Sequence, residues 1–144
     1  MSYLLEDMLV AFSDAELYNG PGLDSFWDKM PADPDRCIVL YEYTGLPPVP
    51  YESAVHRSVQ ITCRNTTASM AKADVDAVYT YLVTHLDEAG RIDFNNRFTQ
   101  TSIRQTPFKI DEDDLGRVTY GFNIGVTTSI DSKEEDDDFY ANWR

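Results

Sequence analysis

The sequence contains few of the residues on which catalysis and metal binding most often depend. Its 144 residues include two cysteines, two histidines and 12 basic residues against 25 acidic ones. Cys37 and Cys63 have neither a metal-ligand spacing nor the Cys-x-x-Cys spacing of redox proteins, so we expect two thiols buried in strands. The net charge of −13 argues against generic binding to DNA phosphates or anionic membranes, because both attract positively charged proteins.

Motifs for nucleotides, calcium and nucleophilic catalysis are also missing. The glycines form no Gly-x-Gly-x-x-Gly or Walker loop. The acidic residues 111–114 are consecutive and Gly116 comes too late for a calcium loop, so we expect a solvated turn, with weak divalent binding as the alternative. His56 and Cys63 lie on opposite faces of one predicted strand, which separates a base from a nucleophile. We therefore expect no enzyme activity, no cofactor and no metal site.

What is present indicates a globular chain rather than a disordered one. Hydrophobic residues make up 42% of the sequence and aromatic residues 12%. No apolar run approaches the roughly 18–20 residues that span a bilayer, and the N-terminus lacks the basic leader of a signal peptide. We expect a single domain over residues 1–130, followed by an acidic and aromatic C-terminal tail over residues 131–144.

The first part of the chain predicts a helix, two strands and a longer helix. Apolar residues at three- and four-residue steps predict a helix over residues 2–18, which Asn19-Gly20-Pro21-Gly22 ends. Residues 19–35 are expected to form a loop, and strands are predicted over residues 36–43 and 54–64. A long helix is predicted from Thr67 to Glu88, with N-cap candidates just before it. Its expected core stripe consists of Ala71, Val75, Val78, Leu82 and Leu86.

The second part predicts strands that end in a hairpin. Residues 91–110 are expected to form one broken strand or two short ones, with a turn at Asn95-Asn96. A final strand over residues 116–130 alternates strictly, with five apolar side chains on one face: Val118, Tyr120, Phe122, Ile124 and Val126. The predicted fold class is α+β, a mostly antiparallel sheet packed on one face by two helices.

Two sequence blocks carry a family resemblance. One is Val59-Gln60-Ile61-Thr62-Cys63-Arg64 with the long helix after it. The other, from Pro107 to Val126, has the pattern Pro-Phe, acidic turn, Gly-Arg-x-x-Tyr-x-Phe-Asn. Together they resemble the minor capsid and tail-terminator (tail-completion) proteins of long-tailed bacteriophages. The resemblance implies fold and ring-contact roles for the residues that match the motif, namely Arg64, Gly116, Arg117, Tyr120, Phe122 and Asn123.

The resemblance also implies a function and partners. Such a protein would be a non-enzymatic virion subunit, made in the host cytoplasm and placed at the head–tail junction. It would form a homo-oligomeric ring, commonly of six subunits, that caps the tail tube and contacts the tube protein and the head–tail connector. No membrane and no specific nucleic acid are expected as partners. The alternative from another class is an acidic inhibitor that mimics DNA and binds a basic host protein, which the net charge supports.

Apolar side chains in predicted loops and the tail, and arginines at strand ends, supply the candidate interface residues. Trp27 and its neighbour Phe26 lie in a predicted loop, where large apolar side chains must fold back or meet a partner. A proline-rich stretch and the aromatic C-terminal residues raise the same expectation, and we expect the tail to dock on a neighbouring chain. The complete set of candidates is Arg64, Arg117, Phe26, Trp27, Pro47, Pro48, Tyr51, Phe139, Tyr140 and Trp143.

Overall fold

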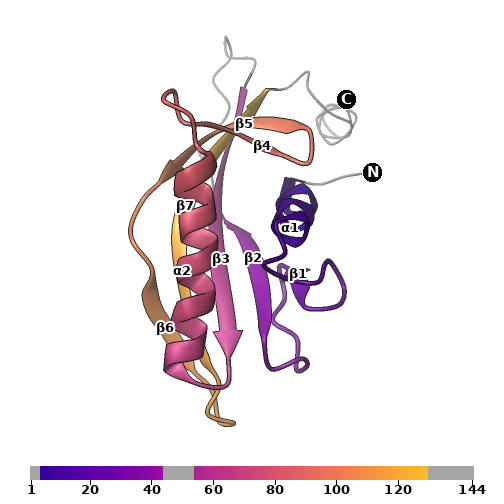
Figure 1. Cartoon of the computed structure of the whole chain (residues 1–144), viewed down its shortest axis with the longest axis vertical. Coiled ribbons are helices and arrows are strands. Elements are labelled where there is room, and N and C mark those ends of the chain that lie inside the picture. Colours follow the sequence, from indigo (N-terminus) through magenta and orange to yellow (C-terminus); the bar gives the residue numbers. More distant parts are fainter. Residues whose placement is uncertain (1–3, 44–53, 130–144) are drawn as a thin grey trace.

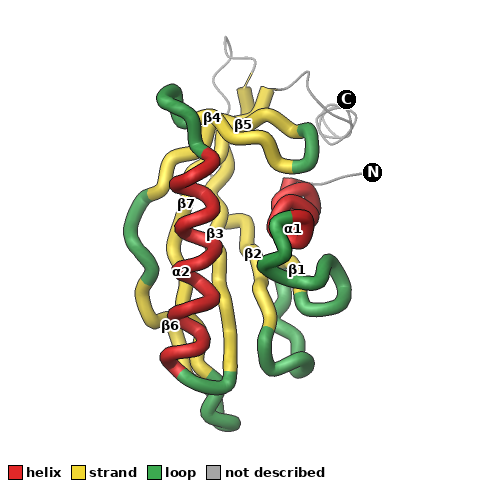
Figure 2. The backbone as a smooth tube through the Cα atoms, viewed as in Figure 1, coloured by secondary structure: helices red, strands yellow, loops and turns green. Residues whose placement is uncertain are grey.

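The protein combines two helices with a seven-stranded sheet. The computed structural model describes residues 4–43 and 54–129. Figure 2 shows the helices and strands along the backbone. In chain order the elements are α1 (Leu4–Asp14), β1 (Ser25–Trp27), β2 (Cys37–Tyr43), β3 (Ala54–Asn65), α2 (Ala68–His85), β4 (Arg91–Phe94), β5 (Arg97–Ile103), β6 (Phe108–Glu112) and β7 (Val118–Ser129).

The sheet has the order β1-β2-β3-β7-β5-β4, and β1 pairs in parallel with β2 while the other pairs are antiparallel. Strands β3 and β7 pair along their whole lengths at its centre. The opposite edge of β7 is shared, because β6 pairs with its first residues and β5 with its last. The predicted α+β class with a mostly antiparallel sheet is confirmed.

Both helices contribute to a single core against one face of the sheet. Figure 1 shows α2 lying along β3 and β7, and α1 beside β1 and β2 near the β4–β5 hairpin. The alternation in β3 and β7 brings their apolar side chains into this core, as the sequence predicted. Fully buried side chains in it include Leu9, Phe12, Leu40, Ile61, Leu82, Phe94, Phe122 and Ile124.

A buried ion pair joins α1 to the β4–β5 hairpin. Arg97 Nε lies 2.7 Å from Asp7 Oδ2, and the two side chains are 0% and 2% exposed. Asn95, in the turn of the hairpin, donates to the other oxygen of Asp7 at 3.1 Å. Removing one partner of such a pair leaves a buried charge without compensation, so the pair ties the hairpin to the helix.

The predicted boundaries are wrong in four places. Helix α1 ends at Asp14 instead of residue 18, because Glu16 adopts a positive φ of 64°. Helix α2 ends at His85 instead of Glu88, and Leu86 has an extended backbone there. The predicted 19–35 loop contains strand β1, whose three residues are too few to show a period. Residues 91–110 hold two strands and the start of a third, and the predicted Asn95-Asn96 turn is present with positive φ at both residues.

Candidate functional site: the uncovered face of the sheet

The face of the sheet opposite the helices carries the predicted interface residues Arg64 and Phe26, and Arg117 reaches it from the turn before β7. We call it the uncovered face. Its side chains come from the alternate positions of the strands, such as Arg64 on β3 and Gly121 and Gly125 on β7. One end of this face is crossed by residues 28–36, the 28–36 loop, whereas the other end forms an open hollow. The two ends therefore offer different surfaces to a partner.

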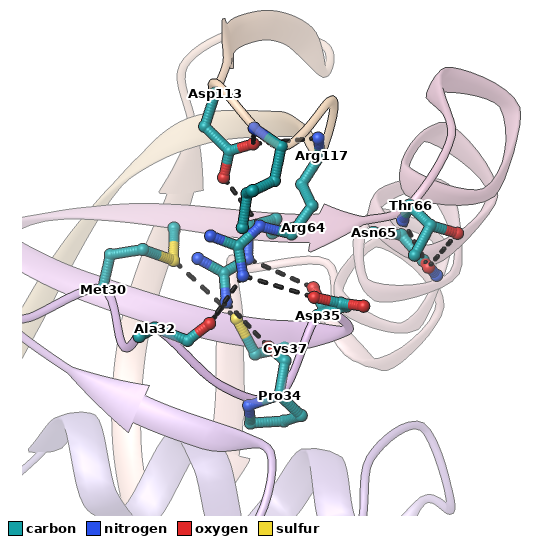
Figure 3. A network of polar contacts seen from close by, with 11 residues as sticks. Met30, Ala32, Pro34, Asp35, Cys37, Arg64, Asn65, Thr66, Asp113 and Arg117 are labelled. Atoms are coloured by element: carbon teal, nitrogen blue, oxygen red, sulfur yellow. Dashed lines mark hydrogen bonds and ion pairs between the residues drawn. The ribbon is translucent and has the colours of Figure 1, made fainter.

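Arg64 anchors the 28–36 loop to the end of β3. Its guanidinium donates to the carbonyl oxygens of Asp35 at 3.1 Å and Pro34 at 2.7 Å, with a longer contact of 3.5 Å to Ala32. Arg64 is only 3% exposed, although it was predicted as an interface candidate at a strand end. Figure 3 shows this arrangement, with Cys37 and Met30 packed beside it. The described contacts of Arg64 are within its own chain, so they stabilise the loop.

Arg117 closes the acidic turn and also reaches the loop. Its Nε lies 2.7 Å from Asp113 Oδ2, and its Nη1 lies 3.3 Å from Asp35 Oδ1 and donates to the carbonyl of Ala32 (Figure 3). The Asp113 carboxylate also accepts the backbone N–H groups of Arg117 and Leu115. Gly116 completes the turn with a φ of 80°, which glycine adopts without steric cost.

These contacts shift the pKa values of Asp113 and Arg117. Desolvation would raise the pKa of Asp113, but the hydrogen bonds from Arg117 and Leu115 outweigh it and lower that pKa below its usual value. The hydrogen bond to Asp113 raises the pKa of Arg117 in return. The predicted solvated acidic turn is thus organised around one carboxylate. Among residues 4–43 and 54–129, no three His, Cys, Asp or Glu side chains lie together as metal ligands would.

The Phe26-Trp27 pair lies on strand β1, beside an apolar cavity of about 780 Å³. Trp27 is 36% exposed, and Phe26 is half-buried. The wall of the cavity also includes Pro21, Met30 and Pro31. Besides β2, only Pro21 forms a bridge with β1 in the described residues, at Ser25, so the rest of its outer edge presents backbone groups as well as aromatic surface.

Several predicted interface residues lie outside the described residues. These are Pro47, Pro48 and Tyr51, and in the C-terminal tail Phe139, Tyr140 and Trp143. Their expected roles stay predictions.

Sequence reasoning missed Arg104, which lies in the open hollow. The hollow measures about 560 Å³ and is lined by β3, β5, β7 and residues 88–90. The guanidinium of Arg104 lies 3.1 Å from Ser58 Oγ and 3.4 Å from the Tyr43 hydroxyl. It occupies the space above Gly125, where a Cβ would come within 2.9 Å of Arg104 Nη2. Glycines at two alternate positions of β7 were the available signal, because they leave room on this face for a neighbouring side chain.

Both thiols are buried, as predicted. Burial raises the pKa of Cys63 to about 12 and also raises the pKa of Cys37, so both stay protonated near neutral pH. Among the described helices, none is both long and apolar enough to cross a membrane.

The fold is that of a small α+β protein with two helices on one face of a curled, mostly antiparallel sheet. The chain belongs to the bacteriophage tail terminator protein family, whose family model matches residues 13–130. It is therefore a structural protein of the phage tail, in a family that is generally non-enzymatic. The predicted resemblance to tail terminator proteins is confirmed.

A solved structure aligns with this chain with a TM-score of 0.49 and 11% identity, covering 88% of this chain and 97% of that chain. None of the curated proteins matches this chain significantly.

Proposed function

We propose that this protein is a tail terminator subunit that forms a ring, caps the tail tube and joins it to the head–tail connector. The observation that carries the proposal is the family match over residues 13–130. The proposal places the protein at the head–tail junction of the virion. No described feature favours the alternative of a DNA-mimicking inhibitor, since several acidic side chains are already paired inside the chain, as Asp7, Asp74 and Asp113 are.

The contacts between ring subunits are proposed to use the β1 edge. Phe26 and Trp27 supply aromatic surface next to an apolar cavity, and aromatic side chains in pockets are the usual anchors of interfaces. Arg64 and Arg117 act on this surface indirectly, because they fix the 28–36 loop that forms part of the cavity wall. The tail over residues 131–144 is proposed to dock on a neighbouring subunit.

Deletion of the gene tests the proposal. We expect virions without the protein to have tails of irregular length or tails detached from heads in electron micrographs. Normal infectious virions in its absence would refute the proposed function. Supplying the wild-type chain from a plasmid should restore infectivity, and the mass of the purified protein reports whether the ring forms before assembly.

Variants in the restored system test the proposed surfaces. Trp27→Ala should lower infectivity while the melting temperature of the protein changes little, because Trp27 is partly exposed. Phe98→Ala is the matched control, since Phe98 is an aromatic residue that is 70% exposed on β5, away from the β1 edge. Truncation after Ser132 should prevent assembly without lowering the melting temperature. Infectious particles built with the truncated protein would contradict tail docking.

A further inference from the structure

The hollow on the uncovered face holds an arginine that has no carboxylate partner within residues 4–43 and 54–129. Arg104 is exposed, and among the described residues its guanidinium contacts hydroxyl groups and forms no ion pair. Arg36, Arg57, Arg91, Arg97 and Arg117 all pair with carboxylates of this chain. Within the same described ranges Arg64 also lacks a carboxylate but is buried against backbone carbonyls, so Arg104 is the exposed case, and in a protein with a net charge of −13 it offers an acidic partner a site.

Hydrogen bonds within the chain orient Arg104 before any partner arrives. Its backbone N–H donates to Asn123 O at 3.0 Å, and the hydroxyls of Ser58 and Tyr43 hold the guanidinium. Gly125 beneath it leaves the space that the guanidinium occupies. An arginine whose planar fork is already oriented loses less conformational freedom when it binds a carboxylate with two hydrogen bonds.

The rest of the hollow also suits an acidic ligand. Ser102 and Thr127 line it with hydroxyl groups that can donate hydrogen bonds to carboxylate oxygens. His56 lies on the same wall, with Nδ1 2.9 Å from Thr127 Oγ1. Arg57 also lines the hollow, but its side chain pairs with Glu42, so Glu88 and Arg104 are the charges that remain there and the hollow is much less negative than the chain as a whole.

The chain itself contains a matching ligand. Residues 131–138 hold six carboxylates and one lysine. Strand β7 ends at Ser129, so Glu134 lies five residues further on and an extended chain would carry it about 17 Å from that end. This reach is sufficient for the acidic run to leave the end of its own strand.

We propose that the hollow around Arg104 receives the acidic run Glu134–Asp138 of a second copy of this chain. The inference rests on the proposed ring and names the surface that would take the tail. The carboxylates would select the partner and its orientation through charge, since complementary charges chiefly steer encounter and fix register. The aromatic residues that follow would add buried area at the rim of the hollow.

A charge exchange between two variants tests this pairing in phage that lack the gene. The first variant is Arg104→Glu. The second replaces Glu135, Asp136 and Asp137 with lysine. We expect each variant alone to lower infectivity at least tenfold compared with the wild-type chain, because like charges would then meet in every contact. Lys72→Glu, on the exposed face of α2, is the control for charge reversal and should complement like the wild type.

Co-expression of the two variants should restore infectivity, because a glutamate in one hollow would meet the lysines of the other chain's tail. In the reciprocal contact, Arg104 of the second variant would meet the unchanged acidic run of the first variant, as in the wild type. Both proteins should keep the wild-type melting temperature, and Arg104→Gln should give a milder loss of infectivity if Arg104→Glu is poorly folded.

Three other outcomes overturn the inference. Full complementation by each variant alone would mean that the hollow and the acidic run do not need each other. Rescue by one chain that carries both changes, without rescue by co-expression, would mean that the tail binds its own chain. Loss of infectivity in both variants with no rescue in either arrangement would assign the two charges to other partners. The proposed function is judged separately, because it fails only if the deletion itself leaves virions normal.

Discussion

The two ends of the uncovered face use arginine in opposite ways. At the end crossed by the 28–36 loop, Arg64 is 3% exposed and donates to backbone carbonyls of its own chain. At the open end, Arg104 is exposed and contacts only hydroxyl groups among the described residues. The two side chains lie on the same face of one sheet, yet among the described residues only the first donates its hydrogen bonds to backbone carbonyls.

The difference shows that residue type and strand position alone do not identify an interface arginine. Arg64 was a candidate because it ends a strand within a family motif, and the structure gives it a role in holding a loop. A charged group that is buried contributes mainly to stability, whereas an exposed and oriented one remains available to a partner. The following variants test this contrast.

The largest effect is expected from Arg64→Ala. It removes the donors that satisfy the carbonyls of Pro34 and Asp35 and leaves a cavity between β3 and the 28–36 loop. We expect the free energy of unfolding to fall by about 3 kcal/mol, since hydrogen bonds from charged groups contribute about 1.5–3 kcal/mol. Urea denaturation followed by fluorescence measures it.

Arg64→Lys is the matched control, because it keeps the charge but loses the planar fork. It should recover only part of the stability, since one ammonium group cannot reach both carbonyls with the same geometry. A change below about 0.5 kcal/mol for Arg64→Ala, the usual range for surface substitutions, would show that the loop does not depend on this arginine.

The second effect contrasts the two glycines on the uncovered face of β7. A Cβ at Gly121 would lie 2.5 Å from the carbonyl oxygen of Ile61 and 2.6 Å from Ile110 Cδ1, so the backbone of the sheet would have to shift. We expect Gly121→Ala to lower the free energy of unfolding by about 2 kcal/mol, within the range for overpacked sites. Gly125→Ala should cost much less, because it meets the movable end of Arg104. Equal losses in denaturant titrations would contradict the contrast.

Much of the fold was predictable, because local patterns decide it. Strict alternation identified β3 and β7, and a capping threonine marked the start of α2, where Thr67 accepts from the backbone N–H of Met70. Strand β1 was not predictable, because three residues are too few to show a period. They form a strand only through their pairing with β2, which the local sequence does not reveal. The position of Arg104 depends on which strands share a face and on the space above Gly125, and those facts arise only from tertiary pairing.

The third effect concerns acid stability at the closed end. The pKa of Asp113 is lowered in the folded protein, so its contribution to stability is present at neutral pH and is lost as the pH falls below about 4, the value of an unperturbed aspartate. We expect the melting temperature of Asp113→Asn to be lower than that of the wild type at pH 7, with the gap closing at pH 3. Asp114→Asn, at an exposed neighbour in the same turn, is the control. A gap that stays constant with pH would refute the assignment.

The smallest effect on stability is expected at the open end, from Arg104→Ala. The side chain is exposed and its hydroxyl partners can turn to water, so the free energy of unfolding should change by no more than about 0.5 kcal/mol. The contrast with Arg64→Ala would then separate an arginine that holds its own chain together from one that is oriented for a partner. A loss as large as that of Arg64→Ala in the same denaturant titration would remove the distinction between the two ends of the face. It would also make Arg104 a structural residue like Arg64.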